Sequence, residues 1–281
     1  MQAFTQWYQN QLDVERLKNY TQTNGTQQTW NSKGITTDAG DNLLSFNAAP
    51  NYFDNPYWVR YKNLQNDIRN RFFGNANLAY KLNDNFTVAG KIMRDGYTSQ
   101  AFEGVMPGGV DQSSYSETTR NFAEMNYEAT LSFNKEFDNL SISVNVGGNR
   151  MNQSYDRTIN STAGGLSLSG FYNLSNSVQP ATIDTYATEK AINSLFATSS
   201  FGFKNMLYVD LMARNDWSSA LSKQDRSYLS PAVTTSFVFS EMMDASWLSF
   251  GKVRVGWGAA GNDSGAYQLD DVFSPQTPNF G

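Results

Sequence analysis

The chain has 281 residues and a net charge of −5, and it contains neither Cys nor His. Disulfides, thiolate nucleophiles, zinc fingers and His-based triads are therefore excluded within it. The thinly spread negative charge argues against a nucleic-acid partner, because phosphate binding needs clustered Lys and Arg. Charged residues make up 17% of the chain and aromatic residues 14%, whereas about 25% of a typical soluble domain is charged.

The mean hydropathy is −0.52, and no run of about 18 apolar residues predicts a transmembrane helix. No N-terminal stretch resembles a signal peptide. A β-barrel wall is compatible with this composition, because only every second residue of each strand meets lipid and the loops are polar.

The N-terminal residues 1–68 have a mixed pattern. We expect a short helix over 13–19 with Asp13 as its N-cap, and a long loop over 21–50, which is rich in Thr, Asn, Gly and Gln. Pro56 restricts the residue before it to extended geometry ahead of a strand. The oxygen ligands that Asp38, Asp41 and Asn42 could offer to Ca²⁺ do not have the spacing of a known calcium loop, so a solvated loop is the preferred interpretation.

Eight segments then alternate between apolar and polar residues, the pattern of a half-buried strand. In the clearest one, Ala123, Met125, Tyr127, Ala129, Leu131 and Phe133 interleave with polar residues. Strands are expected at about 69–82, 86–94, 120–135, 140–147, 195–203, 207–214, 228–239 and 252–260. The apolar side chains of Met125, Tyr127, Leu131, Ile142, Val144, Val209 and Leu211 should meet lipid. The side chains of Glu124, Asn126, Glu128, Asn145 and Asp210 should face the opposite side, a barrel lumen.

Short and long connections alternate between these strands. Tight turns are expected at 83–85, 136–139 and 204–205, and long loops at 21–54, 95–119 and 153–192. This alternation is typical of outer-membrane barrels. The predicted fold class is therefore all-β, an antiparallel transmembrane β-barrel. Eight strands can also close a small barrel by themselves, and that alternative stays open at this point.

Four ordered stretches of the sequence resemble the SusC/RagA family of TonB-dependent outer-membrane transporters. They are Gln6–Asp13 with Leu17–Tyr20 and Trp30–Asn31, then Asn55–Trp58 with Asp67–Asn75, then Arg214–Ser219, and finally Leu248–Asp263. The resemblance covers about residues 6–263. It implies that residues 1–281 are an internal part of a plugged barrel of 22 strands, without the plug domain and the barrel ends.

The resemblance also implies a function and partners. The protein would lie in the cell outer membrane as a multi-pass barrel. It would take up bulky nutrients, either glycans or peptides. A SusD-like surface lipoprotein would cap it, and the TonB complex would act through the absent plug. The alternative function is a structural or docking barrel within a larger surface or secretion assembly. An outer-membrane hydrolase is the third reading, and no catalytic set of residues supports it.

Few residues are candidates for a binding site, and no catalytic, metal or cofactor site is expected. Trp217, Trp247 and Trp257 are interpreted as an interfacial aromatic girdle. Glu124 and Glu128 are read as lumen-facing wall residues, and Asp210 with Arg214 as a charge pair in the wall. The loop aromatics that could contact a ligand by stacking on it are Tyr52, Tyr57, Tyr97, Tyr115 and Tyr172.

Overall fold

The computed structural model describes residues 12–37, 43–243 and 247–269. The candidate calcium ligands at 38–42 and the start of the first resembling stretch lie outside these residues. The chain divides into two compact units: unit 1 is Met1–Asn70, Thr98–Asn121 and Asp156–Tyr186, and unit 2 is Arg71–Tyr97, Phe122–Tyr155 and Ala187–Gly281. No helix in the described part of the chain is long and apolar enough to cross a membrane.

Unit 1 begins with short elements. The expected N-terminal helix is a 3-10 helix, η1 (Val14–Lys18), and Asp13 caps it by accepting a hydrogen bond from the backbone N–H of Glu15. The predicted loop over 21–50 is wrong in part, because it contains a hairpin of β1 (Ser32–Thr37) and β2 (Leu43–Pro50). The polar sequence of β1, SKGITT, resembles a loop and concealed the hairpin, although β2 has the more apolar sequence LLSFNAAP.

A helix that the sequence analysis missed follows the hairpin. Asn55 has the extended backbone expected before proline, with φ −58° and ψ 127°, and it caps α1 (Pro56–Lys62) through its side chain. An Asn cap followed by Pro at the first helical position is a strong helix start, because the cap satisfies a free N–H and the proline ring fixes a helical φ. The next strand begins at Leu64, directly after the helix and ahead of the start predicted at about residue 69.

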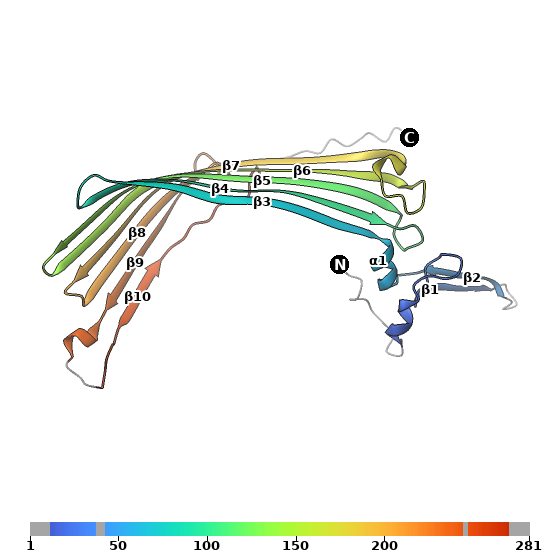
Figure 1. Ribbon diagram of the computed structural model, residues 1–281, viewed down its shortest axis with the longest axis horizontal. Coiled ribbons are helices and arrows are strands. Elements are labelled where there is room, and N and C mark those ends of the chain that lie inside the picture. Colours follow the sequence, from blue (N-terminus) through green and yellow to red (C-terminus); the bar gives the residue numbers. More distant parts are fainter. Residues whose placement is uncertain (1–11, 38–42, 244–246, 270–281) are drawn as a thin grey trace. The chain divides into compact units, whose positions relative to one another are not determined.

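The eight predicted strands are confirmed and form one antiparallel sheet, with sequence neighbours lying side by side (Figure 1). They are β3 (Leu64–Lys81), β4 (Phe86–Val105), β5 (Ser114–Phe137), β6 (Leu140–Leu166), β7 (Ser177–Phe203), β8 (Leu207–Ser218), β9 (Ser227–Phe237) and β10 (Val253–Gly258). The strands β3 and β10 lie at the two edges. Within the described residues the sheet does not close on itself, so the small eight-stranded barrel is not formed.

Several strands are much longer than the sequence analysis predicted. The expected loops over 95–119 and 153–192 consist mostly of strand, because β4 continues to Val105 and β6 and β7 have 27 residues each. The actual connections are 106–113 and 167–176. A strand needs only about 9–11 residues to cross a bilayer at a tilt. These strands are therefore long enough to continue well beyond a membrane.

The predicted tight turns are confirmed. Lys204 and Asn205 have φ of 51° and 56°, the left-handed geometry that a type I′ hairpin turn requires at its two central residues. In the turn between β3 and β4, the side chain of Asn83 accepts hydrogen bonds from the backbone N–H groups of Asn85 at 2.9 Å and Phe86 at 3.0 Å. Such side-chain caps explain why Asn and Asp predict turns well.

The strands of unit 2 have one apolar and one polar face. Leu211 on β8 pairs with Ser199 on β7 and Val233 on β9, and directly paired residues share a face of the sheet. Following this register gives the apolar face on β7 to β10, with the large exposed side chains of Leu195, Phe203, Leu207, Leu211, Leu229, Phe237, Val253, Val255 and Trp257. Asp210 and Arg214 lie on the other face, the polar face.

The same alternation holds along the other strands of unit 2. Tyr127 and Leu131 are both exposed and lie on one face of β5, whereas Glu124 and Glu128 lie on the other. The exceptions are single residues such as Phe73, which is exposed on the face opposite to Phe72. The grouping of the predicted apolar and polar residues on opposite faces is therefore confirmed.

Little of this apolar surface is buried. The buried hydrophobic side chains among the described residues are only those of Leu17, Trp58, Tyr115, Leu166, Ala220 and Val238. A water-soluble chain of this length would enclose a large core. Here the sheet has no second layer, within the described residues, to cover its apolar face.

Candidate functional site

The polar face of unit 2 carries a hydrogen-bonded cluster on neighbouring positions of β7 and β8. The guanidinium of Arg214 contacts the carboxylate of Asp216 at 2.9 Å and donates to the hydroxyl of Ser194 at 2.7 Å. Ser194 in turn donates to Asp216 at 2.5 Å. Ser194 and Asp216 are buried, so each polar group needs a partner, and this three-membered cluster supplies one.

A second ion pair lies next to the first cluster. The ammonium of Lys190 on β7 is 2.7 Å from Oδ2 of Asp263, and both side chains are nearly buried, with 15% and 8% exposed. Ser218 at the end of β8 donates a 2.5 Å hydrogen bond to the same oxygen. Burial alone would raise the pKa of Asp263, but the hydrogen bonds from Lys190 and Ser218 hold its pKa below the ordinary value.

These contacts fix the segment that follows β10. The ammonium of Lys190 also donates to the backbone carbonyl of Ser264 at 3.2 Å, and the hydroxyl of Ser264 donates to the carbonyl of Ala220 at 3.1 Å. The backbone N–H of Gly261 donates to Ser230 on β9. Two of the four stretches that resemble the transporter family, 214–219 and 248–263, are thus joined in space, which the sequence order alone does not indicate.

The predicted wall pair of Asp210 and Arg214 is wrong. The two residues lie four positions apart on one strand, about 13 Å along it, which is too far for a direct contact. Each therefore bonds to a closer residue. Asp210 accepts a 2.6 Å hydrogen bond from Ser200, its direct partner on β7, and Arg214 pairs with Asp216.

A shallow groove on the polar face gathers residues of β3, β4 and β5. It has a volume of about 330 Å³, and its lining includes Asn75, Asn77, Lys91, Glu128 and Thr130. Glu128 therefore lies with a lysine and two amides on the wall. Glu124 accepts hydrogen bonds from Asn126 at 2.8 Å and Gln153 at 3.2 Å. Both glutamates thus lie among polar residues on the polar face of the sheet.

Unit 1 is held together by buried amide side chains. Asn55 is fully buried and donates from its side chain to the carbonyls of Leu17 at 2.9 Å and Gln28 at 2.8 Å. Gln27 is also buried and donates to Asp54 at 3.0 Å. Trp58 packs into this region and is 2% exposed. The arrangement fixes the start of α1.

The five candidate tyrosines divide into two groups in the structure. Tyr115 is buried, and its hydroxyl donates to Glu117 at 3.0 Å. Tyr172 lies with its ring centre 6.3 Å from that of Tyr115, and its hydroxyl donates to the carbonyl of Lys62 at 2.6 Å. Burial raises the pKa of Tyr172. These two side chains are therefore engaged in packing within unit 1.

The other three candidates are more accessible. Tyr52 is 71% exposed. Tyr57, on α1, stacks on Tyr61 with ring centres 6.4 Å apart, and Tyr61 stacks on Tyr20 at 5.4 Å. Tyr97 stacks on Phe122 at 5.4 Å. Sequence reasoning missed the exposed Tyr61, although its helical spacing of four from Tyr57 is the signal that would have found it.

Comparisons with known proteins bear on the fold. No family model matches the chain, and no curated protein does. Among solved structures, the chain is similar to the RagAB peptide transporter, with a TM-score of 0.68 and 17% identity over 89% of this chain. It is also similar to the RagAB peptide importer in its "open-open" state, with a TM-score of 0.69 and 17% identity over 89% of this chain, and in its "closed-closed" state, with a TM-score of 0.65 and 17% identity over 79%.

The chain spans only 27%, 27% and 26% of those three chains, respectively. At this level of identity the similarity shows the fold alone. The chain has the architecture of part of the antiparallel β-barrel wall found in these transport proteins.

Proposed function

We propose that residues 1–281 are part of the wall of an outer-membrane importer of the SusC/RagA type. The observation that supports this most strongly is the uncovered apolar face of unit 2. Leu207, Leu211 and Val255 are 38%, 44% and 68% exposed, and such a contiguous apolar surface needs a lipid or protein cover. A sheet with one apolar and one polar face, built as long antiparallel strands, is the structure that crosses a bilayer as a barrel.

The open edges of the sheet fit the same proposal. In hydrocarbon every backbone N–H and C=O needs a partner, so β3 and β10 require further strands to pair with. A barrel of the 22 strands implied by the family resemblance would supply them and would be wide enough to need a plug. The apolar face would then meet lipid and the polar face the lumen.

The proposed cargo is a bulky nutrient, and peptides are favoured over glycans. The favouring observation is that the similar solved structures are described as a peptide transporter. A SusD-like lipoprotein and the TonB complex enter the proposal through the family resemblance alone. Tyr52 and Tyr57, which lies on α1, are the aromatic residues that we propose as ligand contacts first, because Tyr115 and Tyr172 are occupied by packing.

An uptake assay tests the proposal. Cells that produce the full-length protein should accumulate labelled oligopeptides, and cells lacking it should not. Dissipating the proton gradient should abolish the uptake if the TonB complex drives it. Accumulation of oligosaccharides in place of peptides would reassign the cargo. If cells with and without the protein accumulate both kinds of compound equally, the docking function would be favoured.

A variant pair tests the tyrosines in the same assay. Tyr52→Ala should reduce uptake at limiting peptide concentration, whereas Tyr80→Leu, on the apolar face at 69% exposure, should not. Equal uptake by both variants and the wild type would remove Tyr52 from the ligand contacts.

A further inference from the structure

A pocket on the apolar face of unit 2 lies where that face changes from apolar to polar. Arg150 on β6 donates to Asn193 on β7 at 3.4 Å, and Asn193 pairs directly with Trp217 on β8. Toward the short turns, β7 presents Leu195 and then Phe203 on this face. Toward the long connections, it presents Ala191 and Glu189. The row of Arg, Asn and Trp therefore marks a membrane–water boundary, where Trp side chains concentrate.

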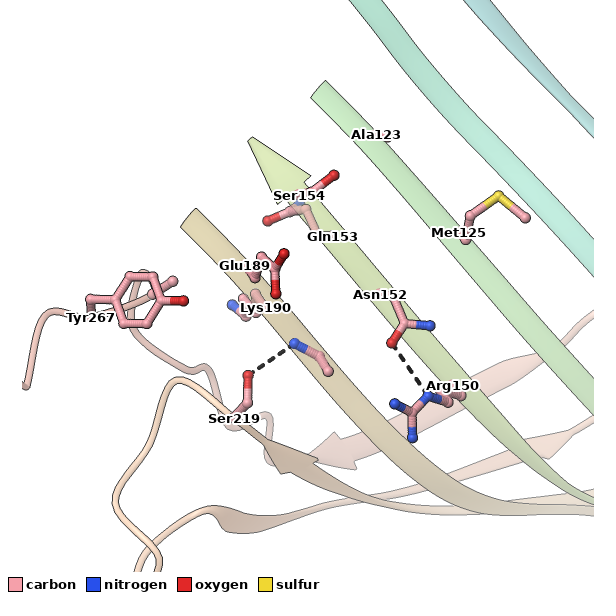
Figure 2. A pocket seen from close by; sticks show the side chains of 12 residues that line it. Ala123, Met125, Arg150, Asn152, Gln153, Ser154, Glu189, Lys190, Ser219 and Tyr267 are labelled. Carbon is pink, nitrogen blue, oxygen red and sulfur yellow. Dashed lines mark hydrogen bonds between the residues drawn. The ribbon is translucent and has the colours of Figure 1, made fainter. Parts of the chain in front are cut away.

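The pocket opens just beyond this row and has a volume of about 590 Å³. Figure 2 shows Met125 on β5, Arg150 and Asn152 on β6, and Glu189 on β7 around it, with Tyr267 from the segment after β10. The pocket is large enough for a sugar unit with a phosphate group. Its lining includes three charged side chains, two amides, hydroxyl groups, and the apolar side chains of Met125 and three alanines.

Two of the three charged side chains that line the pocket, those of Arg150 and Glu189, form no ion pair with another described residue. Among the described residues, Arg150 hydrogen-bonds only to the amide oxygens of Asn152 and Asn193, at 3.3 and 3.4 Å. Lys190, which also lines the pocket, is by contrast paired with Asp263. A guanidinium has five N–H donors in a fork that matches phosphate, and a carboxylate accepts hydrogen bonds from sugar hydroxyls.

We propose that this pocket binds the phosphorylated sugar headgroup of an outer-leaflet glycolipid. The proposal rests on the proposed function, which places the apolar face in lipid and the long connections outside the cell. Arg150 binds the phosphate, while Glu189 and Asn152 bind sugar hydroxyls. Met125 and the apolar band below the pocket contact the first carbons of the acyl chains.

Lipid binding by purified protein tests the proposal. The full-length protein in detergent is titrated with lipopolysaccharide and, in parallel, with the same lipid after enzymatic removal of its phosphates, and bound lipid is counted by native mass spectrometry. The wild type should bind the phosphorylated lipid about tenfold more tightly than the dephosphorylated one, which is the effect of one strong charge-assisted contact. Arg150→Gln should bind both equally weakly.

Arg254→Gln is the matched control, because Arg254 lies on the polar face, on β10. It should bind lipid as the wild type does. Equal binding by Arg150→Gln and the wild type, or equal binding of the two lipids by the wild type, would overturn the proposal. The proposed function is tested separately, because it requires that the wild type fractionates with the outer membrane and imports peptide. Failure of the lipid-binding proposal can therefore be distinguished from failure of the proposed function.

Discussion

The side chains of Lys190 and Asp263 form a nearly buried ion pair, 2.7 Å between Nζ and Oδ2, which ties β7 to the segment after β10. The two residues are 73 positions apart along the chain. Ser218 donates to the same carboxylate oxygen, so one aspartate organises three separate parts of unit 2.

Removing the charge of Asp263 should destabilise unit 2. Asp263→Asn leaves the ammonium of Lys190 nearly buried beside a neutral group, and the expected loss is about 2 kcal/mol, below the roughly 3–5 kcal/mol of a fully buried pair. The measurement is the free energy of unfolding in urea for the lipid-embedded protein. Asp95→Asn is the control, because its pair with Arg71 is much more exposed than the pair of Lys190 and Asp263, with 54% and 35% of the two side chains accessible, and should contribute less. Equal losses in both variants would contradict the special role of Asp263.

The ion pair should resist acid. The pKa of Asp263 in the folded protein lies below the ordinary value of 3.8, so its contribution to stability is complete above that pH and is lost only as the pH falls through the lowered pKa. Hydrogen exchange at residues 259–265, corrected for the intrinsic pH dependence, should therefore be constant between pH 7 and 5. Faster exchange already at pH 5 would show that the carboxylate titrates with a raised pKa.

A glycine on β6 allows an aromatic ring to lie against the sheet. A Cβ built on Gly147 would be 2.5 Å from Cζ of Phe196 and 2.7 Å from the carbonyl oxygen of Ala129. Gly147→Ala should therefore cost about 1–3 kcal/mol through displaced neighbours. Gly90→Ala, at a strand position with no heavy atom within 4 Å of the new Cβ, should cause no loss. Urea unfolding compares the two, and a neutral Gly147→Ala would mean that Phe196 moves freely.

A charged side chain should destabilise the protein much more on the apolar face of β5 than on its polar face. Leu131→Arg places a cation on the apolar face and should cost about 2–4 kcal/mol near mid-bilayer. Thr130→Arg places it on the polar face in the groove with Glu128, and the cost should be much smaller. Folding efficiency in lipid vesicles measures both, and equal costs would contradict the assignment of the faces.

The number and order of strands could be predicted because part of each strand alternates between apolar and polar residues with period 2. Strand length could not be predicted, because this alternation stops before the strand ends. Residues 153–163 of β6 are nearly all polar, and a polar strand with no apolar face has the composition of a loop. This is why the long loops of the sequence analysis proved to be largely strand.

The side-chain clusters within each unit were less predictable for a different reason. The pairs that organise them join positions far apart in sequence, Asn55 with Leu17 in unit 1 and Lys190 with Asp263 in unit 2, and residue type alone does not reveal such partners. Tyr115 illustrates the converse error. An aromatic residue in a polar stretch suggests an exposed loop, yet Tyr115 is buried, with 6% of the residue exposed, and the ring of Tyr172 packs beside it.

The measurement that tests the central claim most directly is thiol labelling on intact cells, since the sequence has no native Cys. Ser169→Cys lies in the connection between β6 and β7, and Asp84→Cys lies in the turn between β3 and β4. A membrane-impermeant maleimide should label Ser169→Cys on intact cells and should label Asp84→Cys only after the outer membrane is permeabilised. Labelling of both positions on intact cells would contradict a wall that crosses the outer membrane.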